Sequence, residues 1–150
     1  MLYFDSNYIL KCYLPEPDAH LVRALASQPV PKSCSRFGRV EVMAALHRKM
    51  REGSLTRAQL KRVWSNVLAD ESAGVWTWLA FDGPVEHALE QALLTLGSRV
   101  FLRAGDAIHL STASLNGFKE IHSHDKHVLR AAAAFGLTGV DVLPRDSALR

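Results

Sequence analysis

The chain has 150 residues, of which 48% are hydrophobic and 22% charged, and its formal net charge at pH 7 is +3. This composition predicts a folded domain with a hydrophobic core and excludes a disordered chain. No stretch approaches the roughly 20 apolar residues of a membrane-spanning helix, and the opening residues MLYFDS lack the pattern of a signal peptide. We therefore expect a cytoplasmic protein without a membrane segment, in which Cys12 and Cys34 are reduced thiols.

The first half of the chain alternates short apolar strands with helical patterns. Residues 2–4 form an apolar run, after which Asp5 and Ser6 are suited to cap a helix that Pro15 and Pro17 end. Apolar spacing and turn residues predict the next elements, which are a helix at 18–26, a strand at 32–35, a helix at 37–51 and a helix from about 56 to 68.

The second half continues the alternation. The expected elements are a strand at 75–79, a helix at 84–96, a helix from 106 to 115, a strand at 119–123, a helix at 125–135 and a strand at 139–143. Strands that alternate with helices predict a parallel sheet. We therefore expect one α/β domain over residues 1–150, with about five parallel strands in a central sheet and helices on both of its faces.

Four carboxylates hold positions that such a fold would bring together. Asp5, Asp106 and Asp125 stand at the start of helical patterns, and two of them follow directly on a strand, so they should face the carboxyl edge of the sheet. Helix capping is an alternative role for each of these aspartates. Glu41 lies inside a helix with no Lys or Arg at neighbouring helical positions, so its charge must be exposed, paired across the fold or bound to a cation.

A cluster of four acids repels itself, so a folded chain needs a compensating cation to hold it. Oxygen ligands of this kind suit Mg²⁺ or Mn²⁺, which points to metal-dependent chemistry on phosphates. Zinc is an alternative because histidines at 109, 122, 124 and 127 lie near Asp106 and Asp125 in the sequence. No Cys ligand or HExxH pattern supports zinc, and we expect these histidines on the surface or supporting the acids.

Basic residues are concentrated in one part of the chain. Positions 36 to 62 contain only two acids, Glu41 and Glu52. The same stretch contains eight basic residues, which are Arg36, Arg39, Arg48, Lys49, Arg51, Arg57, Lys61 and Arg62. One interpretation is the solvated face of two helices. The other is a binding surface for a polyanion. In that case Arg39 and Arg48, on the same predicted helix as Glu41, are the residues most expected to bind phosphates.

Four segments together resemble the PIN-domain ribonucleases, and among them the VapC-type toxins of toxin–antitoxin pairs. They are YFDSNYILKCYLPEP, the spacing of Ser35 to Glu41, RAGDAIHLSTA and SHDKHVLRAAAAFGL, and they cover nearly the whole chain. The resemblance implies that Asp5, Glu41 and Asp106 are the three core acids and Asp125 the fourth. Ser6 matches a hydroxyl that follows the first acid, and Arg103 matches a basic residue before the third.

The resemblance implies a Mg²⁺- or Mn²⁺-dependent endoribonuclease in which Asp5 and Asp106 contact the metal. Glu41 and Asp125 would act partly through water or as a base. The partners it implies are an RNA substrate and an antitoxin protein, and we also expect a homodimer. Alternatives are a solitary PIN-type RNA-processing nuclease and a non-catalytic module that binds a cation and a partner. Receiver domains and aspartyl-phosphate phosphatases fit poorly, because the first strand is followed by Asp-Ser-Asn rather than by an acidic pair or Asp-x-Asp.

Overall fold

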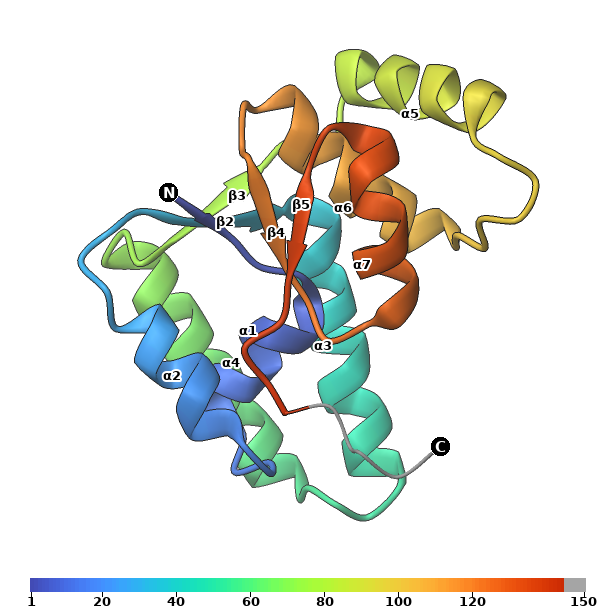
Figure 1. The fold of residues 1–150 in the computed structure, drawn as a ribbon. Coiled ribbons are helices and arrows are strands. Elements are labelled where there is room, and N and C mark those ends of the chain that lie inside the picture. The colour runs from blue at the N-terminus through green and yellow to red at the C-terminus, as the bar shows by residue number, and fades with distance from the viewer. Residues whose placement is uncertain (145–150) are drawn as a thin grey trace.

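The computed structural model describes residues 1–144 and shows helices packed around short parallel strands (Figure 1). The strands of this part of the chain are β1 (Leu2–Tyr3), β2 (Lys32–Ser35), β3 (Trp76–Leu79), β4 (Glu120–His122) and β5 (Thr138–Val140). Its helices are α1 (Ser6–Tyr13), α2 (Ala19–Ala26), α3 (Arg36–Arg51), α4 (Arg57–Ser72), α5 (Gly83–Thr95), α6 (Ala104–Leu115), α7 (Lys126–Ala131) and the 3₁₀-helix η1 (Ala132–Phe135).

Local chemistry sets where most helices begin. Each of five N-cap side chains accepts a hydrogen bond from a backbone N–H of the first turn, and these caps are Asp5, Ser35, Thr56, Asp82 and Asp125. The predicted helices and strands are confirmed, with ends shifted by a few residues. One difference is that α6 begins at Ala104, which places Asp106 in its first turn. Another is that the helix predicted at 125–135 is α7 followed by the tighter η1.

The strands form two sheets. β1, β2 and β3 pair in parallel in that order, and β4 pairs in parallel with β5. A single parallel bridge between Phe4 and His122 joins the two sheets, supported by the Asp5 N–H, which donates to the His122 carbonyl at 3.0 Å. The prediction of one central sheet was wrong in this respect. Pairing between β1 and β4 does not extend beyond the Phe4–His122 bridge because the chain turns at Asp5 into α1, which leaves β1 only two residues long.

Helices cover both faces of the strands, as predicted. Successive side chains of a strand point to opposite faces, and Tyr3 and Phe4 illustrate this at the start of the chain. Phe4 belongs to a buried cluster with side chains of α1, α2 and α3, against which α4 packs. Tyr3 belongs to a second buried cluster with side chains of α6, α7 and η1. Both aromatic side chains are fully buried, so the two cores meet at β1.

Two further expectations concern the whole chain. None of the helices in the described part is both long and apolar enough to cross a membrane. Cys12 is partly exposed, Cys34 is buried, and both are free thiols as predicted.

Candidate active site

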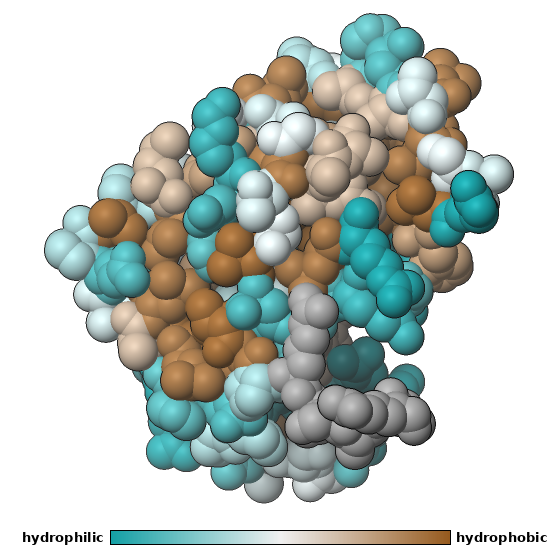
Figure 2. Space-filling model, in the orientation of Figure 1, coloured by the Kyte–Doolittle hydropathy of each residue, from teal (hydrophilic) through white to brown (hydrophobic). Residues whose placement is uncertain are grey.

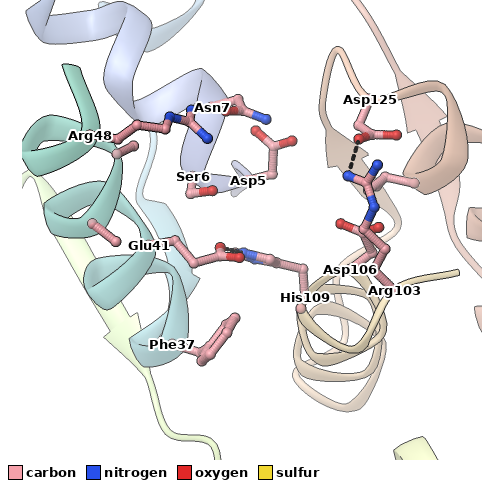
Figure 3. Close-up of a pocket in the computed structure, with 14 residues that line it drawn as sticks. Asp5, Ser6, Asn7, Phe37, Glu41, Arg48, Arg103, Asp106, His109 and Asp125 are labelled. Atoms are coloured by element: carbon pink, nitrogen blue, oxygen red, sulfur yellow. Dashed lines mark hydrogen bonds and ion pairs between the residues drawn. The ribbon is translucent and has the colours of Figure 1, made fainter. Parts of the chain in front are cut away.

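A cavity of about 500 Å³ opens where β1, β2 and β4 end and the following helices begin (Figure 3). All four predicted acids line it, together with residues of α1, α3, α6 and α7. The lining residues are Asp5, Ser6, Asn7, Phe37, Glu41, Ala44, Ala45, Arg48, Arg103, Gly105, Asp106, His109, Asp125 and Val128. The parallel strands therefore gather acids from distant parts of the sequence at one edge, as expected for an α/β fold.

Asp5 is the most buried of the four acids, with 4% of its surface exposed. One carboxylate oxygen accepts from the Tyr8 N–H at 2.8 Å and caps α1, and the other accepts a short hydrogen bond from the Ser123 hydroxyl. Burial raises the pKa of Asp5 to about 6, although both hydrogen bonds favour the charged form. The capping role considered from the sequence is thus real, and the same carboxylate lies in the cavity wall.

Glu41 is paired across the fold rather than exposed. Its Oε2 lies 2.7 Å from Nε2 of His109, a residue of α6 that is 2% exposed. Burial alone would raise the pKa of Glu41, but the hydrogen bond and charge of His109 outweigh it and lower the pKa. The sequence had left three options for this charge, and the structure selects pairing across the fold.

Asp106 and Asp125 lie together on the opposite wall from Glu41 (Figure 3). Burial, followed by the charge of Asp125, raises the pKa of Asp106. Oδ2 of Asp106 is buried and has no hydrogen-bond partner among the described residues. Asp125 caps α7 through the His127 N–H at 2.7 Å, and its other oxygen lies 3.8 Å from the exposed Arg103 guanidinium.

The predicted supporting residues divide into two groups. Ser6, Arg48 and Arg103 line the cavity. Arg39, which was predicted with Arg48 to contact RNA phosphates, is not among the residues that line it. Its Nε lies 3.3 Å from Glu71 of α4, and its guanidinium covers the Trp64 ring at 5.1 Å. Residues two apart on an α-helix point in nearly opposite directions, so Arg39 and Glu41 face different sides of α3.

The histidines near Asp125 do not form a zinc site in the described part of the chain. His122 is buried with Nδ1 3.2 Å from the Tyr3 carbonyl, and His124 pairs with Asp141 at 2.9 Å. The ring of His127 packs against Phe101. Each histidine thus has a different neighbour, and they do not converge on one point.

Sequence reasoning missed the direct partner of Glu41. The sequence predicted that His109 lies on the surface or supports the acids, but only its nearness to Asp106 on the same helix was apparent. Gly38 and Gly105 were not noticed at all, although a Cβ at either position would overlap His109 or Glu41. A glycine next to a predicted site acid is a signal of close approach, and it was available in the sequence at Gly105.

The donor set of the cavity fits a hard divalent cation in kind. Its acids offer oxygen ligands, and Oδ2 of Asp106 is buried without a hydrogen-bond partner within the described part of the chain. Among residues 1–144, however, no three His, Cys, Asp or Glu side chains are grouped closely enough to hold a metal ion as they stand. Both oxygens of Asp5 and Oε2 of Glu41 are already hydrogen-bonded within the protein.

The fold and the site define an α/β protein with an acid-lined cavity at the carboxyl ends of its parallel strands. The family model of the PIN domain matches residues 2–134, and the chain therefore belongs to the PIN domain family. No curated protein matches it significantly in sequence.

Solved structures with the same fold include three that cover nearly the whole chain. FitAcB from Neisseria gonorrhoeae has a TM-score of 0.72 and 18% identity over 95% of this chain and 98% of that chain. VapBC2 from Rickettsia felis, bound to a DNA fragment from its promoter, has a TM-score of 0.68 and 12% identity over 94% and 98%. A toxin–antitoxin complex from Klebsiella pneumoniae has a TM-score of 0.64 and 16% identity over 95% and 98%. At these identities the likeness is one of fold.

Proposed function

We propose that the protein is a Mg²⁺- or Mn²⁺-dependent endoribonuclease and the toxin of a type II toxin–antitoxin pair. One observation carries the nuclease proposal. Four acids line one cavity of a PIN domain, and Asp106 keeps a buried carboxylate oxygen without a partner among the described residues. A buried carboxylate oxygen without a donor is unfavourable unless a cation or a donor completes it.

In this proposal the acids have different tasks. Asp5 and Asp106 would hold the cation directly, while Glu41 and Asp125 would act through water or as a base. When bound, the cation would polarise the scissile phosphate and lower the pKa of an attacking water. Ser6, at the start of α1, would help to orient the carboxylates.

The substrate would be single-stranded RNA, held through its phosphates. Arg48 from α3 and Arg103 at the start of α6 lie on opposite sides of the cavity mouth (Figure 3). A guanidinium on each side of a row of acids suits a phosphodiester chain that crosses the cavity, because the arginines attract the phosphates and a bound cation would offset the negative charge of the acids.

The toxin half of the proposal concerns a protein partner. Structures that share this fold include a toxin–antitoxin complex from Klebsiella pneumoniae. An apolar groove of about 420 Å³ between α3 and α4 adjoins the acid cavity at Ala44, and Val40 within it is 64% exposed. Apolar side chains also gather on the surface over α2 (brown in Figure 2), where Leu21 and Leu25 are only partly buried. Such surfaces favour an antitoxin segment that wraps the domain, and a homodimer forms part of the same proposal.

Cleavage of RNA tests the nuclease. Protein freed of any partner should cleave single-stranded RNA with added Mg²⁺ or Mn²⁺ and stop when EDTA is added. Asp5→Ala and Asp106→Asn should each lose about 100-fold or more of this activity. Equal cleavage by the Asp5→Ala protein, or cleavage that persists in EDTA, would place the activity outside this cavity.

Co-expression tests the toxin. A short reading frame directly upstream should encode a protein that copurifies with this chain and blocks RNA cleavage. Separate elution of the two proteins at micromolar concentration would leave the alternative of a solitary PIN-type nuclease. A chain that binds Mg²⁺ and a partner but never cleaves RNA would instead be a non-catalytic binding module.

A further inference from the structure

His109 connects the acid cavity to the buried core through a chain of hydrogen bonds. Its Nε2 lies 2.7 Å from Oε2 of Glu41 (dashed in Figure 3), and its Nδ1 lies 3.1 Å from the Tyr3 hydroxyl. The charged carboxylate has no proton to donate, so Nε2 must carry the hydrogen. The imidazole therefore donates to Glu41 whether it is neutral or protonated.

The far side of the imidazole is anchored equally firmly. The Tyr3 hydroxyl accepts from the backbone N–H of Ser35 at 3.0 Å, and Tyr3 is fully buried. The Tyr3 ring packs edge-on against Phe118 at a centroid distance of 5.4 Å. Both imidazole nitrogens are thus engaged, Nε2 by Glu41 in the cavity wall and Nδ1 by the Tyr3 hydroxyl of β1, which fixes the ring orientation.

Two glycines make room for this arrangement. A Cβ at Gly38 of α3 would lie 2.7 Å from Cε1 of His109 and 2.4 Å from Sγ of Cys34. A Cβ at Gly105 of α6 would lie 2.8 Å from Oε1 of Glu41. The helices that carry the acid and the imidazole can approach each other here only because neither glycine has a side chain.

The burial of the two partners differs, and this difference argues for a role in the site. The His109 side chain is 3% exposed, whereas that of Glu41 is 31% exposed and faces the cavity. A histidine with a purely structural role would be expected to contact groups of the core alone. Among the described residues, the carboxylate to which His109 is hydrogen-bonded is Glu41 of the cavity wall.

We propose that His109 is a positioning residue that holds the Glu41 carboxylate toward the cavity, through the hydrogen-bond chain from Ser35 and Tyr3. This inference rests on the proposed nuclease function and names a further residue of its site. Burial alone would lower the pKa of His109, but interactions with Tyr3, Cys34 and Glu41 raise it well above its usual value.

A matched pair of substitutions tests the role of Nε2. Gln at position 109 carries its amide about as far out as Nε2, whereas the shorter Asn matches only Nδ1, and both are uncharged amides. His109→Asn should lower kcat about 10- to 100-fold with little change in KM, which is the usual size of losing a supporting hydrogen bond. His109→Gln should recover most of that loss. Equal activity of the two variants, or of His109→Asn and the wild type, would overturn the proposal.

A control on the same helix separates positioning from core packing. Thr112 of α6 is fully buried, and its hydroxyl has no hydrogen-bond partner among the described residues. Thr112→Val should leave kcat and KM unchanged. If it lowered kcat as much as His109→Asn, the effect would reflect the core of α6 and not Nε2, which would also overturn the proposal.

Nitrogen NMR tests the contact without any activity. In the wild type Nε2 of His109 should be protonated with a downfield hydrogen, and Glu41→Ala should abolish that downfield shift. An unprotonated Nε2, or a resonance that Glu41→Ala leaves unchanged, would overturn the inference. A wild type that shows the hydrogen bond but cleaves no RNA would instead reject the proposed function.

Discussion

At the residue scale, the acids of the cavity differ in what surrounds each carboxylate. Asp5 is buried with neutral donors, and the pKa of its carboxyl rises to about 6 because of burial. For Glu41, burial is outweighed by His109, and its pKa falls. For Asp106, burial and the charge of the nearby Asp125 both raise the pKa. Acids whose pKa values are raised by burial and by one another are those that gain most from a bound cation.

Asp5 should make the metal-free protein less stable as the pH rises. Its pKa is about 6 in the folded chain against an ordinary value of 3.8, so the folded state binds the proton more tightly. This stabilisation is fully present below pH 3.8 and is lost as the pH rises through 6. The total loss in the free energy of unfolding is about 3 kcal/mol.

Asp5→Asn isolates this effect, because asparagine keeps an acceptor for the Tyr8 N–H but carries no charge. The free energy of unfolding of the variant, relative to the wild type, should increase by about 2.4 kcal/mol between pH 4 and pH 7. Urea titrations in EDTA at several pH values measure it. Other titrating groups are common to both proteins and cancel. A difference that does not change with pH would contradict the raised pKa of Asp5.

At the scale of elements, the helices and strands were predictable because their signals are local. Caps such as Thr56 with Gln59, and Pro84 in the first turn of α5, mark helix starts in the sequence itself. The four acids were predictable for a related reason, since three of them stand at helix starts. Helices that follow parallel strands begin at the carboxyl edge of the sheet, so the acids at their N-termini come together there.

What escaped prediction depends on contacts between elements. The pairing of Glu41 with His109 joins α3 to α6 over 68 residues, and no periodicity records it. Arg39 was assigned to the site by its nearness in sequence, whereas its direction is set by the rotation of α3. The division into two sheets arises because β1 ends at Tyr3 and only Phe4 bridges to His122, and an apolar run of three residues does not determine where pairing stops.

Gly105 allows a test of the α3–α6 approach. A Cβ there would lie 2.8 Å from Oε1 of Glu41 and 3.1 Å from Cε1 of Phe37, so Gly105→Ala should push the carboxylate aside. Alanine also favours the helix by up to about 1 kcal/mol, so the fold should lose little stability. We expect RNA cleavage to fall about 10- to 100-fold with a nearly unchanged melting temperature.

Gly83 is the matched control for this substitution. It lies in the first turn of α5, and a Cβ added there would meet no atom within 4 Å beyond its immediate neighbours. Gly83→Ala should leave cleavage unchanged. Full activity in Gly105→Ala would show that Glu41 tolerates displacement and is not needed where it lies.

At the scale of the whole molecule, the basic residues between positions 36 and 62 serve different surfaces. Arg39 is paired with Glu71, and Lys49 is paired with Glu16 at 2.6 Å. Arg57 and Lys61 border the apolar groove between α3 and α4. Of the eight basic residues in this stretch, Arg48 is the one that lines the acid cavity. The excess of positive charge is therefore spread over the surfaces of α3 and α4, and of these basic residues Arg48 faces the acid cavity.

Arg48→Ala and Arg39→Ala make a matched pair on α3 that distinguishes these surfaces. With RNA kept intact in EDTA, Arg48→Ala should raise the apparent Kd and reduce the slope of log K against log salt by about 1. Arg39→Ala should leave both unchanged, because Glu71 already neutralises this guanidinium and it lies outside the cavity lining. Fluorescence anisotropy of labelled RNA over a range of salt concentrations measures both quantities. Equal weakening by the two substitutions would mean that RNA lies along the α3–α4 face, and a path across the acid cavity would then be wrong.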